Sequence, residues 1–297
     1  MDLRKILYLC REICTYSNNM NRLTTYTINI GGKLMDLGQC RIMGIVNVTP
    51  DSFYSHCEAA DEALRLAEEM MNNRADILDI GGCSTRPGAE DVSEEEEWNR
   101  ISPVLKLIRN RFPDAVISVD TFQPLVAKRS IEEFGVQIIN DVSGGNERMF
   151  EVVSSLKTPY ILTFNQAPTP ADNGKDITQR ALLFFAEQVQ KLRDRGQNDI
   201  ILDPGFGFNK SLDENYQLLN NMENLQIMEL PILVGVSRKS MISKVLNISP
   251  EAAINGTTTL DTIALTKGAN ILRVHDVKEA KECVGLFDTL TRSNIKR

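Results

Sequence analysis

Three carboxylate and amide side chains stand where short apolar runs of the sequence end. Asp120 lies in the segment SVDT, Asn140 in INDVSGG, and Asp203 in LDPGFGF. A carboxylate accepts two hydrogen bonds side by side, so it can hold a polar ring that presents two adjacent N–H donors. Each residue alone is also typical of a turn or a helix cap, so the chemistry depends on whether the three side chains converge.

Basic side chains in further segments of the same kind could bind an anion. Arg86 lies in DIGGCSTRPG, Arg238 and Lys239 in VGVSRKS, and Arg273 and His275 in RVHD. Guanidinium and ammonium groups are common donors to phosphate oxygens. Asn47, in GIVNVTPDSF, is by itself typical of a turn residue before Thr49-Pro50. Because the chain has only two histidines, a histidine-rich metal site is excluded.

Alternating strand and helix patterns must position these residues. Apolar runs predict strands at 42–48, 76–80, 115–119, 136–139, 159–164, 199–202, 232–236 and 270–274. Periodicity and capping signals predict helices at 59–72, 93–111, 124–134, 148–156, 177–195, 212–220, 249–267 and 278–290. Eight strand–helix pairs predict one α/β fold, a (β/α)8 TIM barrel, in which reactive groups lie at the C-terminal strand ends. A doubly wound sheet is the structural alternative.

The N-terminal part of the chain has a different pattern. Residues 24–30 alternate like a strand, Gly31-Gly32 is a turn signal, and residues 33–37 could pair back, which predicts a short β-hairpin. We expect residues 1–19 to be an extension or a disordered tail and Met20 to be the natural start. No linker or low-complexity segment interrupts the rest, so the pattern predicts one barrel domain over residues 20–297.

Composition narrows the classes of function. The net charge of −7 argues against general nucleic-acid binding. No stretch approaches the ~18 consecutive apolar residues of a membrane-spanning helix. The six cysteines form no CxxC pair, and a chain of 297 residues needs no disulfides for stability. These features predict a protein of a reducing compartment, the cytoplasm, without nucleic-acid or membrane partners.

Taken in order and spacing, the quoted segments resemble the dihydropteroate synthases, the pterin-binding enzymes of folate synthesis. The resemblance covers the chain from about Arg41 to its C-terminus. It implies condensation of 6-hydroxymethyl-7,8-dihydropterin pyrophosphate with p-aminobenzoate, which yields dihydropteroate and pyrophosphate. Positive charge on the exocyclic carbon would be conjugated into the pterin ring, so an SN1-like step is expected. The resemblance also implies Mg²⁺ as cofactor, a homodimer, and competition between sulfonamides and p-aminobenzoate.

The resemblance assigns roles to twelve residues. Those implied for the pterin are Asp120, Asn140, Asp203 and Lys239. Those implied for pyrophosphate are Arg86, Arg273 and His275. Those implied for p-aminobenzoate are Thr85, Pro87, Phe208 and Ser240. Asn47 is implied as the ligand of Mg²⁺. Read without the resemblance, Phe208 is equally a core residue and Ser240 a helix cap.

The chain departs from the pattern of many relatives at three places. Cys83 stands where glutamate is common, Thr163-Phe164-Asn165 where Met-His-Met is common, and Asn209 where glycine is common. None of these changes removes an assigned residue. Loops 49–57 and 84–92 are expected to be mobile lids, because they are polar and contain chain-breaking Thr-Pro-Asp and Arg-Pro-Gly.

Two rival functions share part of the pattern. A methyltetrahydrofolate–corrinoid methyltransferase would share Asp120, Asn140 and Asp203, but not the Ser-Thr-Arg-Pro-Gly loop or Arg-Lys-Ser. A non-catalytic pterin-binding barrel would be favoured by loss of the anion-binding residues, yet Asn47 and the three pyrophosphate residues are present. The barrel fold alone does not separate these functions.

Overall fold

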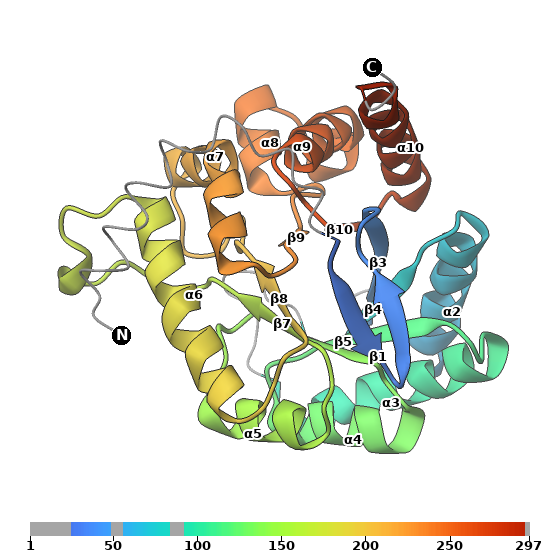
Figure 1. Ribbon diagram of the computed structural model, residues 1–297. Coiled ribbons are helices and arrows are strands. Elements are labelled where there is room, and N and C mark those ends of the chain that lie inside the picture. The colour runs from blue at the N-terminus through green and yellow to red at the C-terminus, as the bar shows by residue number, and fades with distance from the viewer. Residues whose placement is uncertain (1–24, 49–55, 84–91, 295–297) are drawn as a thin grey trace.

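Eight parallel strands alternating with helices form the body of the protein (Figure 1). The computed structural model describes residues 25–48, 56–83 and 92–294, although side chains 56–58 and 294 are not described. The parallel strands are β3 (Arg41–Asn47), β4 (Ile77–Gly81), β5 (Val116–Asp120), β6 (Ile138–Asp141), β7 (Tyr160–Thr163), β8 (Ile200–Asp203), β9 (Leu233–Val234) and β10 (Ile271–Val274). The predicted extension 1–19 lies outside the described residues.

The sheet closes on itself and is therefore a barrel. Its strand order is β8-β7-β6-β5-β4-β3-β10-β9, so the two edge strands are β8 and β9. A parallel bridge joins Leu202 of β8 to Ile232, and the Leu202 N–H donates to the Pro231 oxygen at 2.9 Å. The doubly wound alternative is wrong, because an open sheet would leave these edges apart.

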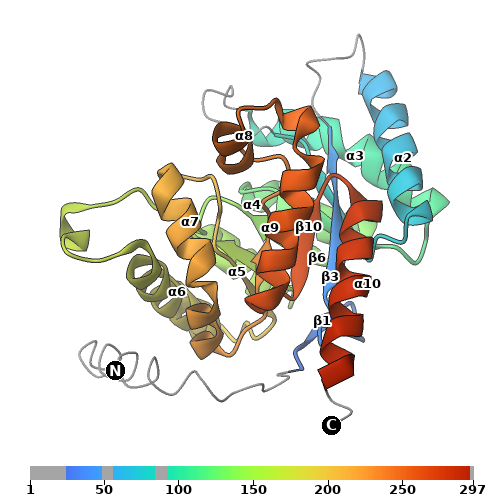
Figure 2. The same ribbon diagram turned by 90° about the horizontal axis from the view of Figure 1, so that it is seen from above.

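Helices surround the barrel (Figure 2). They are α2 (His56–Asn72), α3 (Glu94–Arg111), α4 (Pro124–Phe134), α5 (Glu147–Ser155), α6 (Ile177–Asp194), α7 (Leu212–Asn220), α8 (Ser240–Leu246), α9 (Ile254–Thr266) and α10 (Val277–Asn294). Local signals set many of their ends. The Ser93 hydroxyl accepts the Glu96 N–H at 3.2 Å and begins α3. Proline at the first position begins α4, and Gly135 ends it in the left-handed conformation. None of the described helices combines the length and apolar character needed to cross a membrane.

Two predicted elements differ from the structure. The helix predicted from 249 to 267 is divided into a 3₁₀ turn, Pro250–Ala252, and α9, which begins at Ile254. A helix start at Ser240 was predicted, and the seven-residue α8 begins there, but a helix of two turns leaves too little periodicity to predict its end. Both differences lie between β9 and β10, where tertiary contacts rather than propensity decide the backbone.

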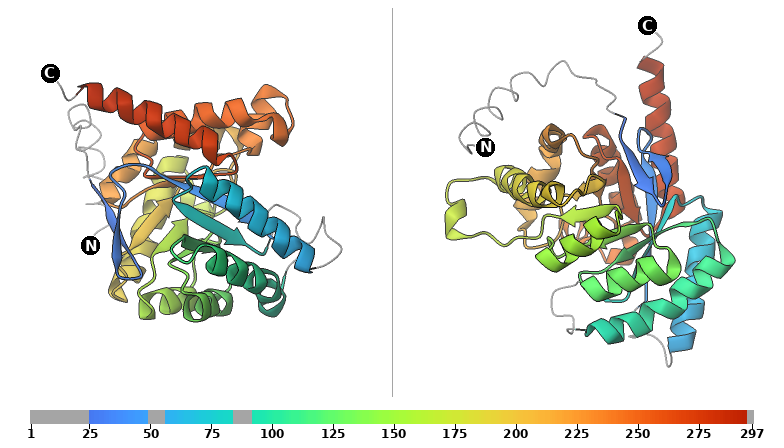
Figure 3. Two further views of the ribbon diagram at one scale, coloured as in Figure 1. Left: turned by 90° about the vertical axis from the view of Figure 1, so that its right-hand side faces the viewer. Right: turned by 60° about the horizontal axis from the view of Figure 1, so that its bottom comes forward.

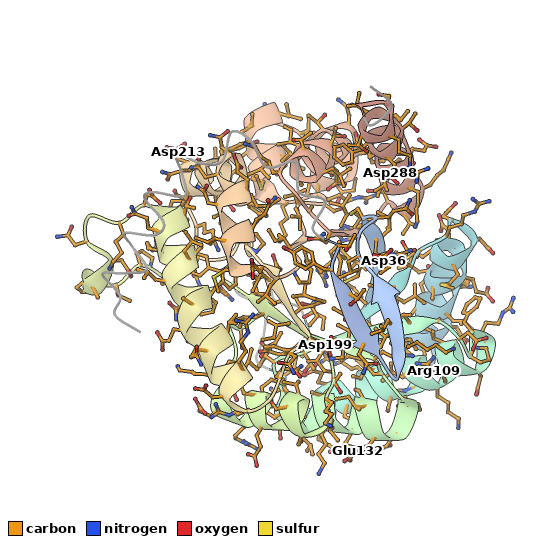
Figure 4. The ribbon with its side chains drawn as sticks, viewed as in Figure 1. Asp36, Arg109, Glu132, Asp199, Asp213 and Asp288 are labelled. Carbon is orange, nitrogen blue, oxygen red and sulfur yellow. The ribbon has the colours of Figure 1, made fainter. Side chains whose placement is uncertain are left out.

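The N-terminal hairpin plugs one end of the barrel. Strands β1 (Thr27–Ile30) and β2 (Lys33–Asp36) pair antiparallel through a turn in which Gly31 and Gly32 have φ of 61° and 90°. The Asn29 N–H donates to Asp199 Oδ1 at 3.0 Å, just before β8 (Figure 4). Figure 3 shows the hairpin against the side from which the strands start.

An apolar cluster fills the interior at this N-terminal end. Its buried members are Ile28, Leu37, Met43, Ile77, Ile138, Ile161, Ile201, Leu233 and Ile271. A larger cluster lies between the strands and the helices. Polar residues occupy the opposite, C-terminal end of the strands, where Asn47, Gly81, Asp120 and Asn140 stand in one register row across four neighbouring strands.

Candidate active site

Four residues from four strands form a charged cluster inside the C-terminal end of the barrel. Arg273 Nε donates to Asp79 Oδ2 at 2.6 Å, and its Nη2 donates to Asp120 Oδ2 at 2.6 Å. Asn140 Nδ2 donates to the same Asp79 oxygen at 3.0 Å. β10, β4, β5 and β6 each supply one of these residues, so the barrel converts residues far apart in sequence into one cluster.

The cluster keeps unused acceptors in a buried place. Asp79 is fully buried, and in the described part of the chain Asp79 Oδ1 and Asn140 Oδ1 have no hydrogen-bond partner. Burial raises the pKa of Asp120, although the guanidinium of Arg273 opposes that rise. Burial works against the charge of Arg273, but Asp79 and Asp120 outweigh it and raise its pKa. A ligand with polar N–H groups could satisfy such acceptors.

Asp203 faces the same end from β8. Its Oδ1 accepts the Gly205 N–H at 2.7 Å, and Thr163 Oγ1 of β7 lies 3.4 Å from its Oδ2. Asp203 is 5% exposed, so its carboxylate is sheltered from water. The turn at Gly205 has φ of +67°, and a Cβ there would stand 2.3 Å from the Phe164 oxygen. Only glycine therefore allows the loop after β8 to pack against the end of β7.

Lys239 reaches into the site from the loop after β9. Its Nζ donates to the Phe206 carbonyl and lies 4.9 Å from the centre of the Phe208 ring. Burial lowers the pKa of Lys239 to about 8, while the charge of Asp203 opposes that shift. A Cβ on Gly235 would lie 3.9 Å from both Lys239 Nζ and Arg273 Cδ. Gly235 therefore lies beside both basic side chains, at ordinary contact distance.

The remaining predicted residues lie at the rim. Asn47 ends β3 exposed, and its Oδ1 would be 3.8 Å from a Cβ on Gly81. His275 Nδ1 is 3.0 Å from Ser237 Oγ, and that hydroxyl also accepts the His275 N–H at 3.2 Å. Ser240 is the exposed first residue of α8. Phe208 is half-buried rather than part of either apolar core.

Some predicted residues cannot be placed here. Thr85, Arg86 and Pro87 lie outside the described residues, as do 49–55 and 84–91 of the two predicted lid loops.

Sequence reasoning missed four polar residues that the structure places beside the predicted ones. They are Asp79, Thr163, Lys210 and Ser237. Asp79 had a usable signal, because it is the single charged residue inside an apolar strand. The structure also pairs Arg238, one of the basic residues near the site, with Asp276 through two hydrogen bonds of 3.0 and 2.5 Å. The guanidinium edge of Arg238 is thus engaged within the protein.

Comparison with known proteins identifies the family of this chain. The family model described as "Pterin binding enzyme" matches residues 43–275. The dihydropteroate synthase of Escherichia coli K12 is 40% identical over 281 residues, which cover 90% of this chain and 97% of the relative. The solved Yersinia pestis dihydropteroate synthase with a sulfonamide drug complex is 38% identical, with a TM-score of 0.83 over 90% of this chain and all of that one.

A third solved structure is that of Xanthomonas albilineans dihydropteroate synthase with 4-aminobenzoic acid. It is 33% identical to this chain, with a TM-score of 0.82, and covers 90% of this chain and 98% of its own. The barrel and the polar residues at its strand ends thus define a pterin-binding barrel enzyme. Within that class, the chain belongs to the dihydropteroate synthase family.

Proposed function

We propose that this protein joins 6-hydroxymethyl-7,8-dihydropterin pyrophosphate to p-aminobenzoate, releasing pyrophosphate and forming 7,8-dihydropteroate. The observation that carries the proposal is the convergence of Asp120, Asn140, Asp203, Lys239 and Arg273 at one end of the barrel. This end supplies hydrogen-bond acceptors for a pterin beside cations for a pyrophosphate. Family membership supports the same reaction.

Asp203 is proposed to hold the pterin. The 2-amino group and N3–H of the pterin are adjacent donors, and a sheltered carboxylate can accept both. Asp203 Oδ1 is already oriented by the Gly205 N–H, which fixes the plane of the carboxylate. Asn140 and Asp120 are proposed to contact the other edge of the ring. Lys239 is proposed to donate to the pterin carbonyl or a ring nitrogen.

The leaving group is proposed to lie on the basic side of the site. Arg273 uses Nε and Nη2 for Asp79 and Asp120, so its Nη1 is not used in those two bonds. His275, oriented by Ser237, and Arg86 are proposed as the other donors. When the exocyclic C–O bond breaks, its electron pair leaves with the pyrophosphate, and the carbon's positive charge spreads into the pterin ring. Buried acceptors near the ring would stabilise that charge.

The proposed Mg²⁺ fits the residues at the rim. In the described part of the chain, no three His, Cys, Asp or Glu side chains group so as to hold a metal ion. Asn47 Oδ1 is exposed and near Asp120, and one amide oxygen suffices for an ion that is otherwise held by phosphate oxygens and water. When bound, the ion would neutralise charge on the leaving pyrophosphate.

p-Aminobenzoate is proposed to stack on Phe208 with its carboxylate toward Ser240. Thr85 and Pro87 are proposed to complete this pocket. The amine nitrogen then forms the new C–N bond and loses a proton. Sulfonamides carry the same aniline with a sulfonyl group in place of the carboxylate, so we expect them to compete with p-aminobenzoate and not with the pterin. Steady-state inhibition at varied p-aminobenzoate tests this pocket.

One coupled assay tests the activity. The purified protein is mixed with both substrates and Mg²⁺, and pyrophosphate and dihydropteroate are measured together. We expect the two products in equal amounts. Pterin binding without turnover would favour a non-catalytic barrel. Methyl transfer from methyltetrahydrofolate to a corrinoid protein would favour the methyltransferase.

A homodimer through α9 and α10 is also proposed. Asp261 is the single charged residue of α9 and is buried, so the exposed face of that helix carries no charge. Ile263 of α9, and Leu286 and Leu290 of α10, are exposed at 38%, 75% and 61%. The two helices pack on each other. Apolar, charge-poor surfaces of this kind are typical of the core of an interface.

Light scattering tests the dimer. The chain has a mass of 33.3 kDa, and the wild-type protein should scatter as twice that mass. Leu286→Glu should shift it to the monomer, while Leu34→Glu, at an exposed apolar residue of the hairpin, should not. A wild-type monomer would overturn this proposal. We also propose a cytoplasmic location, because the cysteine usage suits a reducing compartment.

A further inference from the structure

Lys210 donates hydrogen bonds to three backbone carbonyls at the loop after β8. Its Nζ donates to the oxygens of Phe164, Gly205 and Phe208 at 2.7, 2.8 and 3.0 Å. An ammonium has three N–H donors, so it can donate one hydrogen bond to each of the three carbonyls. The first carbonyl follows β7 and the other two follow β8. The lysine therefore ties two neighbouring loops together at one point.

The three oxygens need a donor at this place. The Gly205 turn brings the two loops so close that a Cβ there would clash with the Phe164 oxygen at 2.3 Å. Carbonyl oxygens that point at one another repel, and a sheltered one without a donor costs free energy. A single positively charged group satisfies all three. The Phe164 ring, 4.5 Å from Lys210 Nζ, adds a favourable cation–π contact.

Charged groups from the surrounding elements act on this amine. Burial lowers the pKa of Lys210 to about 7; Asp203 and Glu214 oppose that shift, and Lys239 and Arg180 add to it. Arg180 of α6 pairs with Glu214 of α7 at 2.8 Å. Lys210 has no carboxylate partner of its own among the described residues. Its hydrogen bonds go to backbone carbonyls, which is what a side chain that fixes the position of a loop requires.

The loop that Lys210 contacts carries the two residues proposed to hold the substrates, which we call the substrate platforms. Asp203, the proposed pterin acceptor, receives the Gly205 N–H at 2.7 Å. Phe208, the proposed p-aminobenzoate platform, donates its N–H to the Gly205 oxygen at 3.1 Å. Gly205 is thus bonded to Asp203, to Phe208 and to Lys210. A shift of this turn would move both platforms.

A second tether acts on the exposed side of the same loop. Asn209 Nδ2 donates to Asn165 Oδ1 at 2.9 Å, and Asn165 Nδ2 donates to the Val142 oxygen at 2.7 Å. These bonds join the loops after β8, β7 and β6. Asn209 has φ of +45°, a conformation that glycine adopts freely. Asn209→Gly therefore removes the tether without strain.

We propose that Lys210 is a positioning residue of the synthase reaction, which sets the Gly205–Phe208 turn so that Asp203 and Phe208 face their substrates. The inference rests on the function proposed above. It concerns the loop after β8, which has no hydrogen bond to Arg273 among the described residues. The affinity for the pterin and the KM for p-aminobenzoate should thus depend on Lys210. The affinity for pyrophosphate should not.

Lys210→Met tests this, because methionine keeps a long apolar side chain and removes the donors. We expect KM for p-aminobenzoate to rise about tenfold or more, pterin affinity to fall, and pyrophosphate affinity with Mg²⁺ to stay unchanged. Lys175→Met is the matched control. Its Nζ also donates to a carbonyl, that of Ala171, but in the 3₁₀ turn Pro170–Asp172, farther along the loop after β7 than Phe164, and its kinetics should equal those of the wild type.

Chemical rescue separates position from packing. Lys210→Cys treated with 2-bromoethylamine regains an amine at nearly the lysine length, and KM for p-aminobenzoate should fall back toward the wild-type value. Wild-type protein treated in parallel controls for the other cysteines. Rescue of thermal stability without rescue of KM would overturn the positioning role.

Two further results keep the test decisive. If Lys210→Met does not fold, Lys210→Arg decides: the guanidinium keeps the charge but cannot place one N–H on each of the same three carbonyls, so we expect KM for p-aminobenzoate to rise by about two- to fivefold with stability nearly unchanged. An unchanged KM in the folded variants would overturn the inference. A wild-type protein that forms no dihydropteroate would instead remove the proposed function, so the two failures are distinguishable.

Discussion

The two ends of this barrel use opposite chemistry on the same strands. At the N-terminal end, inward positions are apolar, and the β1–β2 hairpin inserts Ile28 and Leu37 against them. At the C-terminal end, the next inward positions on five of the same strands are polar or charged: Asp79, Asn140, Thr163, Asp203 and Arg273. Ile77 and Asp79 are two residues apart on β4, as Ile271 and Arg273 are on β10. A step of two residues along a strand keeps the side chain on the same face.

The difference shows how one fold separates stability from function. The apolar end loses no hydrogen bonds on burial and is closed by the hairpin. At the polar end, Arg273 forms ion pairs with Asp79 and Asp120. These ion pairs stabilise the fold only while all three side chains are present. Removing one of these side chains would leave the opposite charge buried without its partner. The intact cluster also keeps hydrogen-bond acceptors that a ligand could use. Four experiments test this contrast.

Arg273→Met should have the largest effect. It leaves the buried carboxylates of Asp79 and Asp120 without their cation, so we expect the free energy of unfolding to fall by about 3–5 kcal/mol and activity to be lost. Urea unfolding followed by circular dichroism measures the first. Ile271→Val, one step toward the apolar end of β10, should cost only about 0.5–1.5 kcal/mol and leave kcat/KM unchanged. Equal losses in the two variants would contradict the contrast.

Asp203→Asn should act on the substrate rather than on the fold. The amide can keep its oxygen toward the Gly205 N–H, and it then presents an NH2 group to the donors of the pterin. We expect pterin affinity to weaken by roughly 2–5 kcal/mol with unfolding nearly unchanged. Calorimetry with the pterin substrate measures this. Wild-type affinity in the variant would remove Asp203 from the pterin site.

The order of binding is the third prediction. Thr85 and Pro87, proposed for p-aminobenzoate, flank Arg86, proposed for pyrophosphate. Pyrophosphate with Mg²⁺ and a pterin should therefore strengthen p-aminobenzoate binding by about 1–3 kcal/mol over the protein alone. Titration of p-aminobenzoate with and without pyrophosphate reveals the coupling. Tight binding to the protein alone, indifferent to pyrophosphate, would speak against it.

The polar end should also make stability depend on pH. Glu97, at the start of α3, is fully buried, and burial raises its pKa from 4.5 to about 7. The folded state then holds a proton that the unfolded state releases, so stability falls as pH rises from about 4.5 to about 7 and levels off above. Glu97→Gln should reduce the slope of the unfolding free energy against pH by an amount that corresponds to up to one proton. Glu95→Gln, on the exposed side of α3, should leave that slope unchanged. Identical slopes from urea titrations at several pH values would exclude this role.

Much of the fold was predictable because its signals are local. Helices α4 and α7 were predicted with the bounds that the structure shows, since Pro124, Gly135 and Ser211 mark their ends. The eight strands were predicted because buried parallel strands are continuous apolar runs. The strand-end positions of Asp120, Asn140 and Asp203 followed directly, because a residue that ends a barrel strand lies at the C-terminal rim.

Local sequence patterns therefore specify the order of the elements and the kind of residue at each strand end. Which of those residues meet depends on the closed barrel. Arg273 is 194 residues from Asp79 and 153 from Asp120, and Lys210 binds a carbonyl 46 residues away. Periodicity and capping act within a few turns of chain, whereas these contacts arise only when closure of the barrel brings distant strands to one rim. Burial at that rim then shifts the pKa values of its charged groups, which no local pattern encodes.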